Sequence, residues 1–158
     1  MFHSPLPIIV IGLDVLAALF AAWQGDRAAR IAGAVNLFNS VSLVIYGAVT
    51  GNAQASEVLE LAGDLIWAVG LLMLVVRYAS LWLGVTMLLQ AVQFSLHAYY
   101  LVMEREHDLV HAWVNNLNEV GISICIAIGT VLAIRRRMVD AREAAEFEAR
   151  RQKTAFAV

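Results

Sequence analysis

Six ionisable side chains lie inside long apolar runs of this sequence, where water cannot solvate a charge. An ionisable group placed in hydrocarbon costs several kcal/mol unless it is paired or hydrated. No Lys or Arg lies within the same runs, so the carboxylates have no permanent cation to pair with. Each must be protonated, hydrated, matched to a protonated His, or bound to a metal ion. The six are Asp14, Glu60, Asp64, His97, His111 and Glu119.

Helical spacing places most of the buried polar residues on three faces. Residues three and four positions apart lie on the same side of a helix. A face with several polar residues turns towards other helices and away from lipid. The three faces consist of Glu57, Glu60 and Asp64; of Gln90, Gln93, His97, Tyr100 and Glu104; and of Asp108, His111, Asn115 and Asn118.

These faces reach similar depths below the outer boundary of the membrane. At about 1.5 Å per residue, Glu60 and His111 lie about 6 Å deep. His97, Asp64 and Asn115 lie about 10 to 12 Å deep on the same scale. The sequence therefore predicts one polar layer, an outward-open pocket in the outer half of the bundle.

Two further carboxylates, Glu119 and Asp14, extend this polar lining together with the amide of Gln93. Gln93 and Glu119 continue it towards the membrane midplane, at the level expected for Asp14 near the first helix centre. The predicted pocket thus has an outer part and a deeper part.

A transition-metal site is the sharpest hypothesis for the pocket. His97 and His111 would supply imidazole nitrogens, and Glu60 and Asp64 carboxylate oxygens, a donor set that suits Zn, Fe, Mn or Cu. A divalent ion would also neutralise both carboxylates. No HExxH or comparable short metal motif is present. The residues expected around the ligands are Gln93, Tyr100, Asn115, Glu119 and Asp14.

Three other interpretations use the same residues. In the first, they form a hydrogen-bonded network that fixes helix packing in an accessory or assembly subunit of a larger membrane complex. In the second, His97 and His111 are the axial ligands of haem b, which would place acidic groups beside an apolar macrocycle. In the third, a proton-linked carrier binds a cationic substrate with Asp14, Glu60, Asp64 and Glu119.

The sequence leaves open whether the protein is an enzyme. A metal-bound water with Glu60 or Glu119 as base would be able to hydrolyse a substrate. The sequence has no GxSxG context for a serine nucleophile and no glycine-rich phosphate loop, so serine-nucleophile and ATP-driven chemistry are set aside.

The composition is that of a membrane protein. Hydrophobic residues make up 61% of the 158 residues, charged residues 15%, and mean hydropathy is +0.71. A net charge of −2 offers no basic field for nucleic acid. The single cysteine, Cys125, cannot form an internal disulfide. The lipid bilayer is thus the expected surrounding.

Five apolar runs predict an all-α fold, a polytopic bundle of five transmembrane helices. A spanning helix needs about 20 apolar residues, and 158 residues leave no room for a separate soluble domain. The first run follows a start without Lys or Arg, so we expect it to be retained and not cleaved as a signal peptide. The bundle would occupy 1–134 and a charged helical tail 135–158. The runs are 5–23, 31–50, 58–76, 81–103 and 109–134.

The distribution of positive charge predicts the orientation. Ten of the eleven Lys and Arg residues lie on one side of the predicted spans, and only Arg105 lies on the other. Cytoplasmic loops carry this excess, so the N-terminus should be outside and the C-terminus cytoplasmic, in a bacterial inner membrane. Trp23, Tyr78 and Trp82 would lie at the inner boundary.

Small residues recur at helical spacing in two places. Gly47 and Gly51 form a GxxxG pair, and Gly121, Cys125 and Gly129 form a row in the last run. Such rows permit close approach of helices, either within the bundle or in a homo-oligomer.

Overall fold

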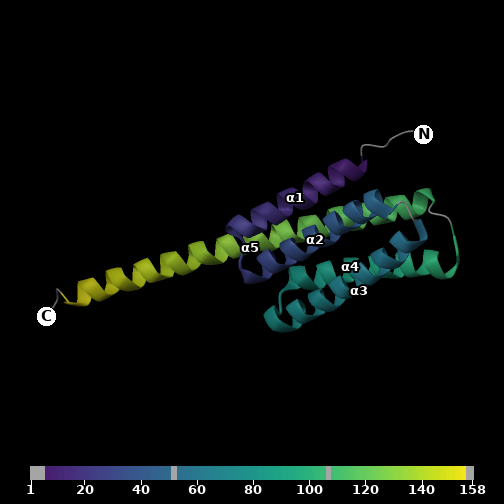
Figure 1. The fold of residues 1–158 in the computed structure, drawn as a ribbon. Helices are drawn as coiled ribbons and strands as arrows, with labels where there is room; N and C mark the ends of the chain where they lie inside the picture. Colours follow the sequence, from purple (N-terminus) through teal and green to yellow (C-terminus); the bar gives the residue numbers. More distant parts are fainter. Residues whose placement is uncertain (1–5, 51–52, 106–107, 156–158) are drawn as a thin grey trace.

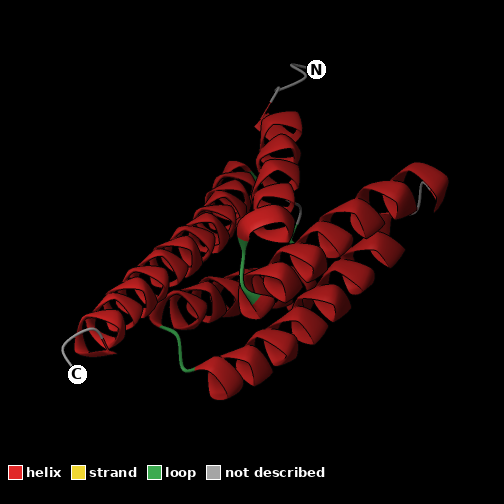
Figure 2. Ribbon diagram, turned by 90° about the vertical axis from the view of Figure 1, so that its left-hand side faces the viewer, coloured by secondary structure: helices red, strands yellow, loops and turns green. Residues whose placement is uncertain are grey.

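A computed structural model describes residues 6–50, 53–105 and 108–155, and all regular structure in these ranges is helical. The helices follow the predicted apolar runs closely (Figures 1 and 2). They are α1 (Leu6–Gln24), α2 (Arg27–Thr50), α3 (Ala53–Tyr78), α4 (Leu81–Val102) and α5 (Leu109–Ala155).

Local interactions explain where several helices begin and end. The Asp26 carboxylate accepts a hydrogen bond of 2.9 Å from the backbone N–H of Ala29 and caps the start of α2. Asp108 caps α5 in the same way. Between α3 and α4, Ala79 adopts a left-handed conformation (φ 45°), and its N–H bonds the carbonyl of Val75 at 2.8 Å. This closes α3 and reverses the chain within two residues.

Each helix packs against its neighbours in the chain, and α1 also packs against α5. The helices therefore close into a ring, with an additional contact between α2 and α5. Over the described residues, α3 makes no backbone approach to α5. The short α1–α2 and α3–α4 connections lie at one end of the bundle, called here the extension end because α5 continues past it. The opposite end, where α5 begins at Asp108, is called the cap end (Figure 1).

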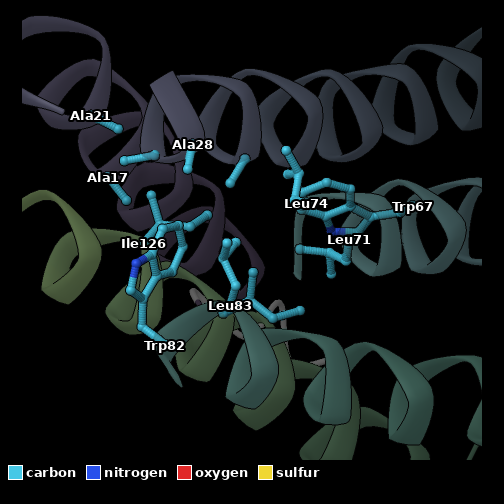
Figure 3. Packing of buried hydrophobic residues seen from close by; sticks show 12 residues of the cluster. Ala17, Ala21, Ala28, Trp67, Leu71, Leu74, Trp82, Leu83 and Ile126 are labelled. Atoms are coloured by element: carbon cyan, nitrogen blue, oxygen red, sulfur yellow. The ribbon is translucent and has the colours of Figure 1, made fainter. Parts of the chain in front are cut away.

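The apolar core fills the part of the bundle towards the extension end (Figure 3). The helices α1 and α2 contribute only alanines to it, which lets their backbones approach closely. The larger side chains of α3, α4 and α5 fill the remaining space. The members are Ala17, Ala21, Ala28, Ala29, Ala32, Trp67, Leu71, Leu74, Trp82, Leu83, Ile122 and Ile126.

Among the described residues, three helices are long and apolar enough to cross a membrane: Glu57–Tyr78 in α3, Leu81–Val102 in α4 and Leu109–Gln152 in α5. A shorter apolar helix, Ile8–Gln24, lies within α1. The fold is therefore an all-helical bundle with membrane-span character, which agrees with the predicted fold class at this level.

The predicted tail continues α5 without a break. All residues of 135–152 are exposed, a helical length of about 27 Å at 1.5 Å per residue. At its base, the Arg137 guanidinium donates a hydrogen bond to the backbone carbonyl of Gln24 at the end of α1. We refer to residues 135–152 as the α5 extension.

The packing of the tryptophans and of the small-residue row on α5 tests two predictions made from the sequence. Trp23 is 76% exposed, but Trp82 is only 6% exposed and lies in the core, not at the lipid boundary. Its indole covers Gly129, where an added Cβ would lie 2.5 Å from a ring carbon. Gly121 likewise faces Leu89 of α4. The small-residue row of α5 therefore serves packing within the chain. The Gly47–Gly51 pair extends outside the described residues.

Candidate functional site

His97 on α4 contacts Asp64 on α3 through its Nδ1 atom. The Nδ1–Oδ2 distance is 2.5 Å, and both side chains are buried. The other carboxylate oxygen of Asp64 accepts a hydrogen bond of 2.9 Å from the side-chain amide of Gln90. Both oxygens of this buried carboxylate thus have partners, as burial in an apolar medium requires.

The second ring nitrogen of His97 faces α5 and the outer part of α3. Its Nε2 atom lies 3.1 Å from Oδ1 of Asn115, and the Gln93 side-chain amide donates to that same oxygen. Oε2 of Glu60 lies 4.0 Å from Nε2. Because α3 and α5 do not pack directly over their described residues, His97 joins them. We call Glu60, Asp64, Gln90, Gln93, His97 and Asn115 the His97 cluster.

The hydrogen bonds define how many protons this cluster holds. Oδ1 of Asn115 is an acceptor, so Nε2 of His97 carries a hydrogen. A second hydrogen lies between Nδ1 and Oδ2 of Asp64. The pair is neutral overall, whether it is written as imidazolium and carboxylate or as imidazole and carboxylic acid. Asp64 therefore needs no metal ion to balance its charge.

His111 lies beside His97 at the start of α5. The two ring centroids are 5.3 Å apart at 37°, and the Tyr100 ring meets His111 edge-on at 4.7 Å. The Tyr100 hydroxyl donates to Oδ1 of Asp108 at 2.6 Å, and the backbone N–H of His111 donates to the same oxygen at 2.9 Å. The Tyr100 bond, and after it the His111 N–H, hold the pKa of Asp108 below its usual value.

The predicted outward-open pocket is largely filled by these mutual contacts. What opens between α3 and α4 is a narrow depression lined by Glu57, Glu60, His97 and Leu101. It borders the His97 cluster on the side of the cap end.

A second polar cluster surrounds Asp14 on α1. Its carboxylate accepts hydrogen bonds from the Asn36 amide at 3.3 Å and the Ser40 hydroxyl at 3.0 Å, both on α2. The Ser123 hydroxyl on α5 donates to Oδ1 as well. These three donors solvate a carboxylate that is almost fully buried. Asp14, Asn36, Ser40 and Ser123 form the Asp14 cluster.

Glu119 on α5 belongs to neither cluster but interacts electrostatically with Asp14, Asp64 and His97. Within the described ranges of the chain, its Oε2 atom is buried without a hydrogen-bond partner, as are Oε1 of Gln93 and Nδ2 of Asn118.

The structure brings together most of the residues that the sequence singled out. Glu60, Asp64, Gln93, His97 and Asn115 meet in the His97 cluster, and His111 and Tyr100 lie beside it. Asp14 and Glu119 lie apart from it, as described above. Within the described residues, no three His, Cys, Asp or Glu side chains are placed to hold a metal ion together.

Four partners in these clusters were not predicted as site residues. Gln90 bonds Asp64, and Asn36, Ser40 and Ser123 bond Asp14. Gln90 shares the polar face of His97, so its spacing was a usable signal. The two serines carried none, because their role depends on which helices are neighbours.

Compared with models of known protein families, with curated proteins and with solved structures, the chain matches none. Its function must therefore be argued from its own residues.

The Asp108 contacts predict a specific acid dependence. Because folding lowers the pKa of Asp108, its stabilising effect is complete above the unfolded value, about 3.9, and is lost as pH falls through the lower folded value. Asp108→Ala should lower the thermal midpoint in detergent at pH 7, and the difference from wild type should shrink below about pH 4. Asp140→Ala, on the exposed α5 extension, is the matched control. A pH-independent difference at Asp108 would contradict this assignment.

Proposed function

We propose that the chain is an integral membrane protein that crosses the bilayer five times. The three span-like helices, the apolar α1 and the 24-residue α2 support this number. The N-terminus would be outside and the C-terminus cytoplasmic, in a bacterial inner membrane. The clustering of Arg27, Arg30, Arg77 and the Arg-rich start of the α5 extension at one end of the bundle supports the orientation.

We further propose that the protein acts without catalysis, as an accessory or assembly subunit of a larger membrane complex. The observation that carries this is the link from Asp64 through His97 to Asn115, which joins three helices and leaves the Asp64–His97 pair neutral overall. A network with these properties fixes helix packing and a unique arrangement of the bundle. It requires no substrate.

The α5 extension supplies a surface for a partner. It is exposed all round, carries charges of both signs and meets the bundle at its base, where Arg137 donates to the carbonyl of Gln24. A helix that is polar on all sides gains little from packing in its own chain, and commonly bridges to another component.

A metal-binding role is the second candidate, because one feature favours it. Histidines that bind metals usually donate their other ring nitrogen to a carboxylate, as Nδ1 of His97 does to Asp64. Nε2 would then face an ion together with Glu60 and His111, and Asp64 would orient the ring. Binding requires that Nε2 release Asn115. Axial ligation of haem b would require the same release.

Substitution within the His97–Asp64 pair tests the packing function. His97→Ala leaves Asp64 buried without its partner, and breaking a buried pair in this way costs about 3–5 kcal/mol. Asp64→Ala together with His97→Ala should cost less than the sum of the two single variants by at least about 1 kcal/mol. Reversible unfolding in detergent measures the three values. Additive losses would show that the pair does not stabilise the fold as a unit.

The same preparations decide between packing and metal binding. Protein purified without chelators should contain no near-stoichiometric Zn, Fe, Mn or Cu by elemental mass spectrometry. If a metal is present and is lost in both His97→Ala and His111→Ala, the metal role replaces the packing role.

The orientation is open to cysteine labelling. Cys125 is first replaced by Ala, since it is the only cysteine. In intact cells, an impermeant maleimide should then label Glu104→Cys at the cap end but label Ala141→Cys in the α5 extension only after permeabilisation. Both positions are exposed, so equal accessibility of the side chains makes the comparison matched. The reverse pattern would invert the proposed topology.

The assembly role predicts a change in complex size. In mild detergent extracts of native membranes, the full chain should migrate on native gels as part of a complex larger than its own dimer. Removal of residues 138–158 should release it from that complex. The thermal midpoint of the purified bundle should stay unchanged, because the removed residues that the structure describes are exposed. A full chain that migrates alone would contradict an accessory role.

A further inference from the structure

We propose that Glu119 and Asp14 form an internal proton-binding site, which protons from the cap end reach through the His97 cluster. This goes beyond the packing role, since it assigns a ligand and a route to carboxylates that the packing network does not use.

A polar stripe on α5 connects the two clusters. Asn115, Glu119 and Ser123 are spaced by four residues and so lie on one face of the helix. Asn115 belongs to the His97 cluster, and Ser123 donates to Asp14. Glu119 stands between them, on the only helix that contributes to both clusters.

The gap between the clusters contains polar atoms that lack partners. Oε2 of Glu119 and Oε1 of Gln93 are buried and accept no hydrogen bond from the described residues. Buried acceptors of this kind are normally satisfied by a proton of their own or by an internal water. Gln93 also bonds Asn115, so this gap adjoins the His97 cluster directly.

The charges around Glu119 require a proton to be held in this region. Among the described residues, α1 presents Asp14 to it, α4 presents His97, and α3 presents Asp64 with Glu60 further out. The face of α2 near Asp14 offers only the neutral groups of Asn36 and Ser40.

His97 is already matched to Asp64, so no cation is left for Asp14 and Glu119. Two neighbouring carboxylates in a medium of low polarity cannot both be ionised. At least one of the two therefore holds a proton.

The route from the cap end has an entrance and a defined order of groups. The depression at Glu57 and Glu60 opens onto His97. A proton that leaves the Asp64–His97 pair for Glu119 is replaced from outside through Glu60, so the pair gains one proton for each that it loses. Glu119 passes its proton to Asp14 past the Ser123 hydroxyl. Acidic and His side chains in series of this kind are typical of intramembrane proton relays.

Access from the other end is closed. Below the two clusters lies the apolar core with Trp67, Leu71, Leu83 and Ile126, and these side chains are almost fully buried. A cavity between α1 and α5 borders Ser123, but its other lining residues, among them Leu13 and Val120, are apolar. The polar groups thus end at the Asp14 cluster, and the arrangement is a binding site and not a channel. Proton occupancy would follow the pH at the cap end.

Infrared spectroscopy of the full chain in lipid vesicles tests the site. At neutral pH the wild type should show the C=O band of a protonated carboxylic acid, which shifts in D2O. Glu119→Gln should lose the intensity of one carboxylic acid, because Asp14 alone keeps its three donors and ionises. Glu146→Gln, on the α5 extension, is the matched control and should keep the full intensity. Absence of the band in the wild type, or its full intensity in Glu119→Gln, would overturn the proposal.

The route is tested by the rate at which the band shifts after transfer to D2O. Gln93→Met keeps the side-chain volume but removes the polar link, so exchange should be at least tenfold slower. Gln24→Met makes the same change at the extension end and should leave the rate unchanged. Should Gln93→Met not fold, as judged by its helix content and size, Asn115→Leu provides the second test. An unchanged rate in a folded variant of either position would show that protons do not enter this way.

Discussion

The structure depends on one constraint: carboxylates lie within apolar runs of the helices that contain no Lys or Arg to neutralise them. Asp64 meets this constraint by pairing with His97, and Asp14 by accepting three hydrogen bonds. Each solution requires side chains from other helices, so satisfying the charge also fixes the helix arrangement. The contacts of the Asp64–His97 pair position α3, α4 and α5 relative to one another. The hydrogen bonds of Asp14 do the same for α1, α2 and α5.

The long helix α5 is the element that both solutions share. It presents Asn115 to one cluster and Ser123 to the other, and its glycines let α4 approach. Towards the extension end, packing takes over from hydrogen bonding, with alanines on α1 and α2 facing the two buried tryptophans. The bundle is thus polar at one end and apolar at the other. This asymmetry explains why the depression lined by Glu57 and Glu60 lies towards the cap end.

Sequence reasoning predicted the helices and the level of the site, and failed where neighbours had to be known. Helical spacing and depth placed Asp64, His97 and Asn115 together because both quantities are properties of single helices. The bond from Ser123 to Asp14 joins residues 109 positions apart and depends on α1 lying beside α5, which no periodicity specifies. Trp82 was wrongly expected at the lipid boundary for the same reason. Its depth was predictable, but the presence of Gly129 opposite it was not.

The protonation of His97 is what separates the possible roles of the site. A metal ion needs a bare lone pair on Nε2, whereas Oδ1 of Asn115 needs a hydrogen there. Gln93 strengthens the need for a hydrogen on Nε2 of His97, because the Gln93 amide already donates to Oδ1 of Asn115 and fixes that oxygen as an acceptor. The ion would have to turn Asn115 away, leaving the Gln93 amide without its acceptor inside the bundle. A proton meets no such obstacle, since the Asp64–His97 pair exchanges it while every other hydrogen bond in the cluster stays in place.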